Sequence, residues 1–299
     1  SVAIIFVAMA QTLPVLIGGL DLSVGAVMTL TNCVASELLN GTPAEMLLGA
    51  LVTLACGAAF GCVNGLIVVY GRIQPIITTL ATGAVAIGLA LLIRPRPGGD
   101  VDSDLSWAMT NTVFDFTETY GLAEGGEAAW LQPFASIPVP LLIVLAVVLF
   151  IWIPFRNTQT GRTVYAVGSA EGGAYMTGLP VGRAKIAAFT LAGLFAGCAG
   201  LYLAIQTSSG NADITQAGAY TLNSIAAVVL GGTSLYGGVG GAIGSLVGAL
   251  ILRVISFYFR ILAIDPLLQP LIEGMVLLGA VSLGALRTLR VKNRLELFR

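Results

Sequence analysis

Long apolar stretches alternate with short polar connections over almost the whole chain. Several stretches approach the roughly 20 residues that an α-helix needs to cross the hydrocarbon core of a membrane. The pattern predicts an all-α, polytopic membrane protein that forms one transmembrane domain over residues 1–299, because no polar linker is long enough to divide it. The nine predicted segments are 2–18, 24–39, 46–70, 75–93, 137–155, 186–205, 222–236, 239–259 and 266–285.

Composition supports a membrane location. Hydrophobic residues make up 57% of the chain and charged residues 10%, whereas soluble domains carry about 25% charged residues. Segments 24–39 and 222–236 are short and rich in Gly, Ser, Thr and Asn. This is typical of broken or half-buried helices that face other protein rather than lipid.

Lysine and arginine in short connections predict the orientation, because such residues are enriched on the cytoplasmic side of membrane proteins. Four basic residues lie in the connection 156–185 and five in the tail 287–299. We therefore expect both to be cytoplasmic, with Arg72 marking a third cytoplasmic turn.

The loop 94–136 carries seven acidic residues and is expected on the periplasmic side, since its neighbours are expected inside. Arg94 and Arg96 at its start oppose this assignment. An odd number of segments with a cytoplasmic C-terminus places Ser1 outside. We therefore expect one further helix before residue 1, which gives ten helices with both ends cytoplasmic.

Two ionisable residues fall within predicted membrane segments, where charges are costly and usually functional. Arg253 and Glu273 each lie about seven residues, or roughly 10 Å of helix, from the same outer surface. We expect an ion pair between neighbouring helices, and a role in the solute path or in a proton relay is the alternative. The chain has no histidine, which leaves a proton relay poorly equipped.

Metal or redox chemistry has no support in the sequence. Histidine is absent, and the four cysteines have no CxxC spacing. We read them as small packing residues and expect no metal, no cofactor and no catalytic residues. They are Cys33, Cys56, Cys62 and Cys198.

Polar residues inside or between the apolar segments are candidates for a translocation pathway. Asp21 lies in the stretch Gly18–Gly25 and reads either as a helix N-cap or as part of an interrupted helix that lines a polar path. Asn64 either ties helices together or faces a hydrated path. The candidate pathway residues are Gln11, Asp21, Ser23, Asn64 and Thr78.

Two glycine repeats with a spacing of four place small residues on one helix face, which permits close approach between helices. They are Gly57, Gly61 and Gly65, and Gly240, Gly244 and Gly248. The nearby stretch 231–241 is glycine-rich but lacks the Gly-Lys-Ser/Thr of a nucleotide-binding P-loop. We therefore expect no ATP hydrolysis by this chain.

The connection 156–185 contains a run of small residues. A short helix is expected at 169–176, capped by Ser169 and closed at Gly178. Such a helix offers a shallow shape for docking on another protein, and a plain connecting loop is the alternative.

The sequence resembles the permease family of ribose-type and related sugar ABC importers, which also includes relatives for other small solutes. Several stretches carry the resemblance in order along the chain. They are Gly-Gly-Leu-Asp-Leu-Ser-Val-Gly at 18–25, Asn64-Gly65, Arg-Ile-Gln-Pro-Ile-Ile-Thr-Thr-Leu-Ala-Thr at 72–82, Tyr-Ala-Val-Gly at 165–168, Ala-Ala-Val-Val-Leu-Gly-Gly-Thr-Ser-Leu at 226–235 and Gly-Gly-Val-Gly at 237–240.

The resemblance implies a type II-like ABC importer transmembrane domain in the bacterial inner membrane. It also implies a second permease subunit, identical or different, a pair of cytoplasmic ABC ATPases and a periplasmic solute-binding protein, with no nucleic-acid partner. The family's coupling segment matches 168–178, which makes Gly168, Ser169, Glu171, Ala174 and Gly178 candidate ATPase-coupling residues. Ser169 and the pair Gly173-Ala174 depart from the family's usual residues there, as do Arg253 and Glu273 in the membrane.

The expected function is import of a sugar or similar polar small solute by alternating access, powered by a separate ATPase. An ATP-independent channel or facilitator is one alternative. An ABC permease for nucleosides or branched-chain amino acids is another.

Overall fold

The computed structural model describes residues 2–115 and 135–265, with positions 268, 271–272, 274–275, 278–279 and 282. Over this part of the chain the regular structure is helical, and β-pairing is limited to isolated bridges. The helices are α1 Val2–Leu16, α2 Val24–Leu38, α3 Pro43–Tyr70, α4 Pro75–Ile93, α5 Ser103–Thr110, α7 Val139–Val147, the π-helix η2 Val148–Trp152, α8 Ile153–Asn157, α9 Gln159–Ser169, α10 Glu171–Met176, α11 Val181–Thr207, α12 Ile214–Leu230 and α13 Ala242–Ile261.

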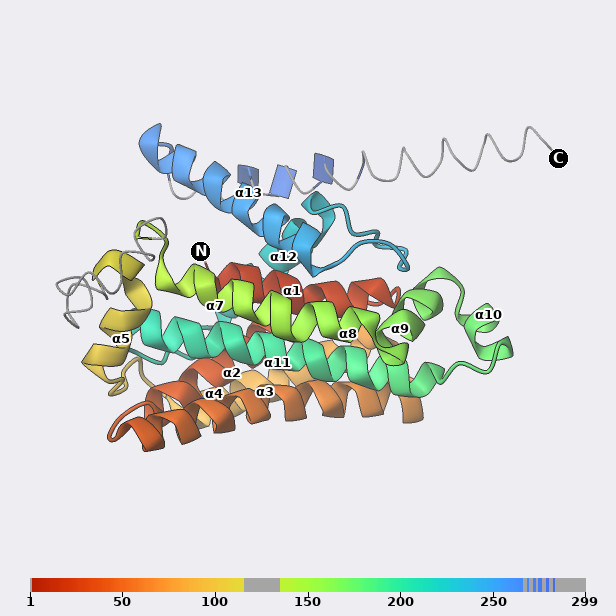
Figure 1. Ribbon diagram of the computed structural model, residues 1–299, viewed down its shortest axis with the longest axis horizontal. Coiled ribbons are helices and arrows are strands. Elements are labelled where there is room, and N and C mark those ends of the chain that lie inside the picture. The colour runs from red at the N-terminus through yellow and green to blue at the C-terminus, as the bar shows by residue number, and fades with distance from the viewer. Residues whose placement is uncertain are drawn as a thin grey trace.

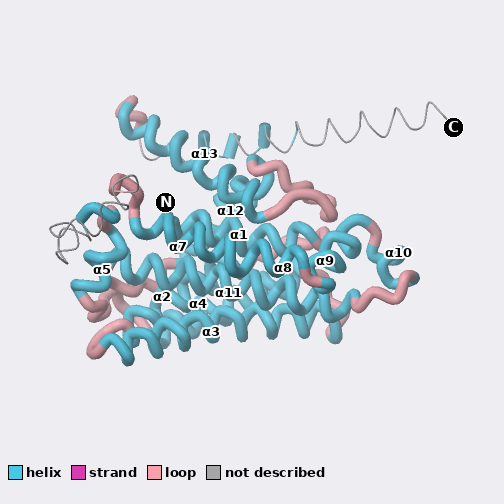
Figure 2. The backbone as a smooth tube through the Cα atoms, viewed as in Figure 1, coloured by secondary structure: helices cyan, strands magenta, loops and turns pink. Residues whose placement is uncertain are grey.

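The long helices lie side by side, and their connections gather at two opposite ends (Figures 1 and 2). One end, which we call the α10 end, holds α9, α10 and the connections 17–23, 71–74 and 231–241. The other, which we call the α5 end, holds α5 and the connections 39–42, 94–102 and 208–213. Sequence-distant turns therefore share one surface at each end.

Membrane-spanning capacity agrees with the hydropathy pattern. Within the described part of the chain, five helices are long and apolar enough to cross a membrane, namely Pro43–Tyr70, Pro75–Ile93, Val139–Asn157, Val181–Thr207 and Ala242–Ile261. Shorter apolar helices are Val2–Leu16, Val24–Leu38 and Ile214–Leu230. The prediction of an all-α, polytopic membrane protein is confirmed.

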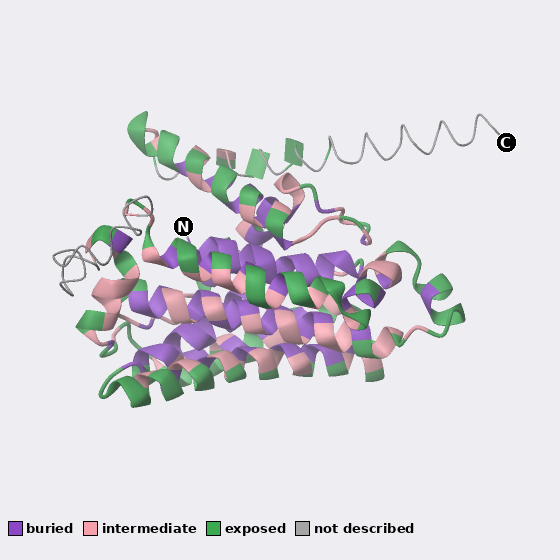
Figure 3. Cartoon of the chain, in the orientation of Figure 1, coloured by how far each residue is buried: buried purple, intermediate pink, exposed green. Residues whose placement is uncertain are grey.

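Helix α1 forms the centre of the bundle. All of its residues from Val2 to Leu16 are buried, and it contacts α11, α12 and α13. Figure 3 shows it as buried along its length. A helix that is apolar on every side is expected inside a larger bundle, and the neighbours of α1 enclose it in this way.

Helices α3 and α11 pack closely through glycine. Gly57 and Gly61 of α3 lie against Gly193 and Gly197 of α11, and an added Cβ at Gly61 would collide with the carbonyl oxygen of Phe189. Gly65 likewise lies against Ile186. Small residues on both helices let the backbones approach. The matching pair on α11 was not singled out in the sequence.

The second glycine repeat is only partly helical. Gly244 of α13 lies against Gly231, and Gly248 lies against the carbonyl of Ala227 in α12. Gly240 precedes α13, adopts φ +123° and contacts Thr233. Placing Gly240 on a helix face was therefore wrong, because its backbone conformation is incompatible with a helix.

Helix α12 lies earlier in the chain than the predicted segment 222–236. Helix α12 begins earlier, because the Asp213 carboxylate accepts hydrogen bonds from the amides of Thr215 (2.8 Å) and Gln216 (3.2 Å). It ends at Leu230, where Gly232 takes φ +80° and stops the helix. Most of the predicted segment 266–285, the tail 287–299 and positions 116–134 of the acidic loop lie outside the described residues.

Candidate translocation and coupling site

A tight turn joins α1 to α2 at the α10 end. Pro14 lies in the last turn of α1, and its carbonyl accepts a hydrogen bond from the amide of Gly19 (2.9 Å). Gly18 has φ +76°, a conformation open mainly to glycine. The chain therefore reverses within a few residues and brings Asp21 back toward α1.

Four of the candidate pathway residues form one hydrogen-bonded network at this turn. The Gln11 amide, in the orientation that gives both its atoms a partner, donates to the Asp21 carbonyl (2.8 Å) and accepts from the Asp21 amide (3.2 Å). The Asp21 carboxylate accepts from the amide (2.8 Å) and the hydroxyl (2.5 Å) of Ser23. The Ser23 hydroxyl in turn accepts from the Asn64 side chain (2.9 Å). The network thus links α1, the turn and α3.

Thr78 is not one of the hydrogen-bonding members of this network. Its neighbour Thr79 contacts the turn instead, because the Thr79 hydroxyl accepts a hydrogen bond from the Leu22 amide (2.9 Å). The sequence shows two adjacent threonines at the start of α4, but it does not indicate which of them faces the turn.

The network is closed to solvent in this subunit. All five candidates and Thr79 are buried. The side-chain oxygens of Asn64 and Thr78 have no hydrogen-bond partner among the described residues, although buried polar groups nearly always have one. Either oxygen is able to accept a hydrogen bond, and the Thr78 hydroxyl is also able to donate one.

The expected cytoplasmic connection contains two helices, α9 and α10. The Thr158 hydroxyl caps α9 by accepting from the Gly161 amide (3.0 Å). Ala170, with φ −163°, separates α9 from α10. Ser169 is the last residue of α9, and its hydroxyl donates to the Tyr165 carbonyl (3.0 Å). The expectation that Ser169 caps the short helix was therefore wrong.

Helix α10 is held to α11 by charge. Lys185 Nζ lies 2.6 Å from Glu171 Oε1, and the turn after α10 closes at Gly178 with φ +78°. Ala174 is buried, whereas Tyr175 and Met176 are strongly exposed. Ala174 therefore packs inward, and the outer surface of α10 comes from two residues that sequence reasoning did not select. Side-chain size could have identified both residues from the sequence, since they are the largest in a run of small residues.

Gly168 joins three parts of the chain. An added Cβ there would collide with the carbonyl of Leu16 and the amide of Gly238. These two groups already share a hydrogen bond of 2.9 Å from the Gly238 amide to the Leu16 carbonyl. The end of α9, the end of α1 and the connection 231–241 thus meet with no space for a side chain.

The α5 end carries most of the described acidic residues, and Arg94, one of the two arginines that opposed its assignment, is neutralised. Arg94 Nη2 lies 3.0 Å from Glu37 Oε1. Its Nε also donates to the Ser36 hydroxyl (3.1 Å) and its Nη2 to the Ser36 carbonyl (3.2 Å). A compensated arginine contributes little net charge to that face.

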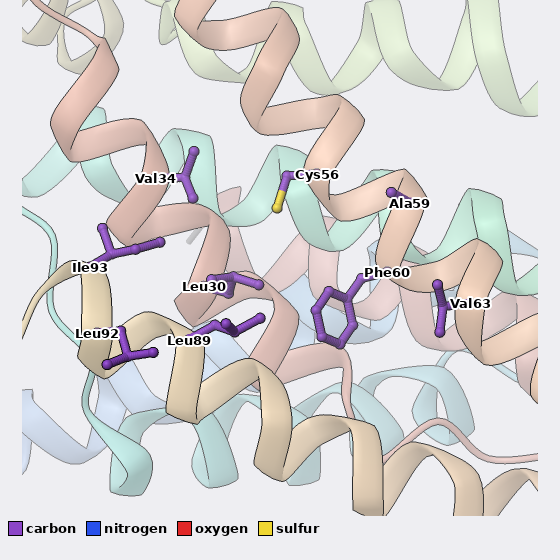
Figure 4. A pocket seen from close by; sticks show the side chains of 9 residues that line it. All are labelled: Leu30, Val34, Cys56, Ala59, Phe60, Val63, Leu89, Leu92 and Ile93. Carbon is purple, nitrogen blue, oxygen red and sulfur yellow. The ribbon is translucent and has the colours of Figure 1, made fainter.

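A groove of about 420 Å³ lies between α2, α3 and α4 (Figure 4). Its lining is wholly apolar and consists of Leu30, Val34, Cys56, Ala59, Phe60, Val63, Leu89, Leu92 and Ile93. A polyhydroxylated solute would lose its hydrogen bonds to water there without replacement. The groove therefore suits an acyl chain or an apolar side chain better than a polar cargo.

Arg253 is the remaining candidate. Its Nε is buried and has no hydrogen-bond partner among the described residues. Glu273, its expected partner, lies outside the described residues. The ion pair therefore stays a prediction.

The described residues form an all-α bundle of membrane-spanning helices, with a buried polar network at the turn between α1 and α2. These features are those of a membrane transport protein. The chain belongs to the family described as "Branched-chain amino acid transport system / permease component", whose model matches residues 1–281. It is a permease subunit of an ABC importer, and so a transporter component rather than an enzyme.

Similar proteins are named as permeases of sugar transport systems. The ribose import permease protein RbsC of Escherichia coli (strain K12) is 35% identical over 274 residues, covering 92% of this chain and 79% of RbsC. The fructose import permease protein FruG of Bifidobacterium longum (strain NCC 2705) is 34% identical over 255 residues, covering 85% and 71%. The D-allose transport system permease protein AlsC of Escherichia coli (strain K12) is 29% identical over 283 residues, covering 94% and 80%. No solved structure matches the chain significantly.

Proposed function

We propose that this permease moves a sugar or a similar polar small solute into the bacterial cytoplasm by alternating access. A separate ABC ATPase supplies the energy, a periplasmic binding protein delivers the solute, and a second permease subunit completes the path. The names of the ribose, fructose and allose relatives support the choice of a sugar.

The distribution of charge supports a cytoplasmic α10 end. Its basic residues are Arg72, Arg156, Arg162, Arg183 and Lys185. Arginine and lysine concentrate on the cytoplasmic side of inner-membrane proteins. The α5 end then faces the periplasm, where its acidic residues meet the binding protein. The C-terminal tail 287–299, which is basic, is assigned to the cytoplasm on the same rule.

The observation that carries the proposal is the continuous contact from α10 to the buried polar network. Helix α10 is attached through α9 to Gly168, which touches the end of α1 at Leu16. Helix α1 holds Gln11, whose amide pairs with the backbone of Asp21. A displacement of α10 by a docked ATPase is therefore passed to α1 by a backbone contact, which yields little. The buried Gln11 side chain then passes it from α1 to the turn.

Asn64 and Thr78 are the residues that we propose to meet the solute. Each has a buried oxygen that is unpaired among the described residues, and each lies on a helix beside the turn. A solute hydroxyl supplies the missing partner when the helices rearrange, because a hydroxyl both donates and accepts hydrogen bonds. The apolar groove between α2, α3 and α4 is assigned to lipid instead.

Reconstitution in liposomes tests the proposal. We expect uptake of ribose or a related sugar to require the ATPase, ATP and the binding protein together. Uptake by the permease alone would identify a channel or facilitator instead. Uptake of a nucleoside or a branched-chain amino acid, with no sugar transported, would keep the ABC mechanism and reject the cargo.

A further inference from the structure

The glycine-rich connection Gly231–Gly241 has no assigned role so far. It resembles a phosphate-binding loop but has no lysine to neutralise a phosphate. It nevertheless exposes two large side chains at the α10 end, with 72% of Tyr236 and 62% of Val239 accessible. Single exposed apolar residues are common, whereas apolar residues that gather in one place mark interaction sites.

The loop has a defined shape. The Ser234 amide donates to the Val239 carbonyl (3.0 Å), and the Gly237 amide donates to the Ser234 carbonyl (3.0 Å). The Gly241 amide donates to the Thr233 hydroxyl (3.2 Å). These bonds close the loop on itself, so Tyr236 and Val239 project from a fixed frame.

The same loop is fastened to the coupling helices and to α1. The Tyr165 hydroxyl of α9 donates to the Gly240 carbonyl (2.9 Å). The Gly238 amide donates to the Leu16 carbonyl (2.9 Å). Gly237, with φ +86°, approaches the Gly168 carbonyl so closely that a side chain is excluded. The glycines thus serve contact with protein rather than with phosphate.

The exposed residues of the loop belong to the same end of the molecule as those of α10 (Figure 1). In α10, 76% of Tyr175 and 89% of Met176 are accessible. Lipid hydrocarbon is a poor cover for the loop, because irregular backbone that faces acyl chains leaves polar groups unsatisfied. Apolar side chains on a polar loop at the end of the bundle instead suit a soluble protein partner.

We infer that the Gly231–Gly241 loop is a second docking element for the ATPase, which contacts Tyr236 and Val239 while it contacts α10 at Tyr175 and Met176. This inference rests on the proposed function, which assigns the α10 end to the cytoplasm. Because the Gly238 amide is hydrogen-bonded to the Leu16 carbonyl, the contact of the ATPase with this loop acts on α1 without passing through α9. Contacts with both α10 and the loop would fix the orientation of the ATPase on the permease. A contact with α10 alone would let the ATPase rotate about that helix.

Photo-crosslinking in the assembled transporter tests the inference. A photoreactive phenylalanine analogue is placed at position 236, at position 175, or at position 214, where Ile214 is comparably exposed (62%) at the α5 end. We expect crosslinks to the ATPase from 236 and 175 and none from 214. A crosslink from 175 without one from 236 overturns the second contact and leaves the proposed function standing.

Other crosslinking outcomes separate the remaining possibilities. Failure at both 175 and 236 overturns this inference together with the proposed coupling role of α10. A crosslink from 236 to a second permease copy, or to lipid alone, assigns the loop to a different occupant and overturns the inference.

Substitution gives an independent measure. Tyr236→Asp is expected to reduce co-purification of the ATPase at least severalfold, while Tyr236→Phe retains it. Tyr70→Asp is the matched control, since Tyr70 is 76% exposed at the same end but belongs to α3. Equal losses in the two aspartate variants, or no loss in Tyr236→Asp, overturn the inference.

Discussion

The amide of Gly238 donates a hydrogen bond of 2.9 Å to the carbonyl of Leu16, the last residue of α1. Gly168 of α9 covers this bond at a distance that allows no side chain. One backbone contact therefore connects the coupling helices, the loop 231–241 and the central helix of the bundle.

Gly168→Ala should separate these three elements. The added methyl group meets backbone atoms, which cannot rotate away, so we expect a loss of about 1–3 kcal/mol of stability and a severalfold fall in ATP-driven uptake. The matched control is Gly172→Ala in α10, since nothing lies within 4 Å of a Cβ at that position. Thermal unfolding in detergent and uptake in liposomes measure the two effects. Equal behaviour of the two variants would contradict a role for the Gly168 contact.

Glu171→Arg should uncouple ATP hydrolysis from uptake while membrane insertion is retained. The change replaces the 2.6 Å ion pair with Lys185 by two like charges. A partly exposed pair contributes about 0–1 kcal/mol, so the fold should persist while α10 loses its attachment to α11. ATPase activity and uptake are measured together in liposomes.

The charge-exchanged double variant, Glu171→Lys with Lys185→Glu, is the control for this pair. It should restore coupling in part, because the attraction is re-formed with the charges reversed. Undiminished uptake by Glu171→Arg would remove Glu171 from the coupling mechanism.

Asn64→Leu should destabilise the turn between α1 and α2. The Ser23 hydroxyl would lose the Asn64 amide as a donor while it still donates to the Asp21 carboxylate, and the loss of one hydrogen bond costs about 0.5–1.5 kcal/mol. Thr78→Val removes a hydroxyl oxygen that has no partner among the described residues, so its stability should change little. If Thr78 meets the solute, that variant should raise the solute concentration for half-maximal uptake. Equal melting temperatures of Asn64→Leu and the wild type would refute the structural part.

Arg253 and Glu273 are best tested by a double-mutant cycle. Neutralising Arg253 alone should strand a buried carboxylate and destabilise the bundle by about 3 kcal/mol or more, whereas replacing both residues with apolar ones should cost less. Thermal unfolding of the two single variants and the double variant gives the coupling energy. A double variant that is the least stable of the three would show that the two residues are not paired.

Residues of the candidate site differ in how far they could be predicted. The sequence identified Gln11, Asp21, Ser23 and Asn64, because polar groups inside or between apolar membrane segments are costly and must find partners. Sequence reasoning missed Thr79, Tyr175 and Met176, since hydropathy does not tell which face of a helix turns inward. Gly240 was misplaced because its spacing fits a helix while its backbone conformation does not.

Hydropathy and charge by themselves determined that the chain is a bundle of membrane helices, where most helices begin and end, and which end is basic. The reason is that a bilayer imposes a minimum apolar length and an uneven distribution of Lys and Arg, and both are local properties of the sequence. Only the tertiary structure decided that Gly168, Leu16 and Gly238 meet, and that Gln11 reaches the backbone of Asp21. Such contacts depend on how helices distant in the chain pack in three dimensions, and no local pattern encodes that arrangement.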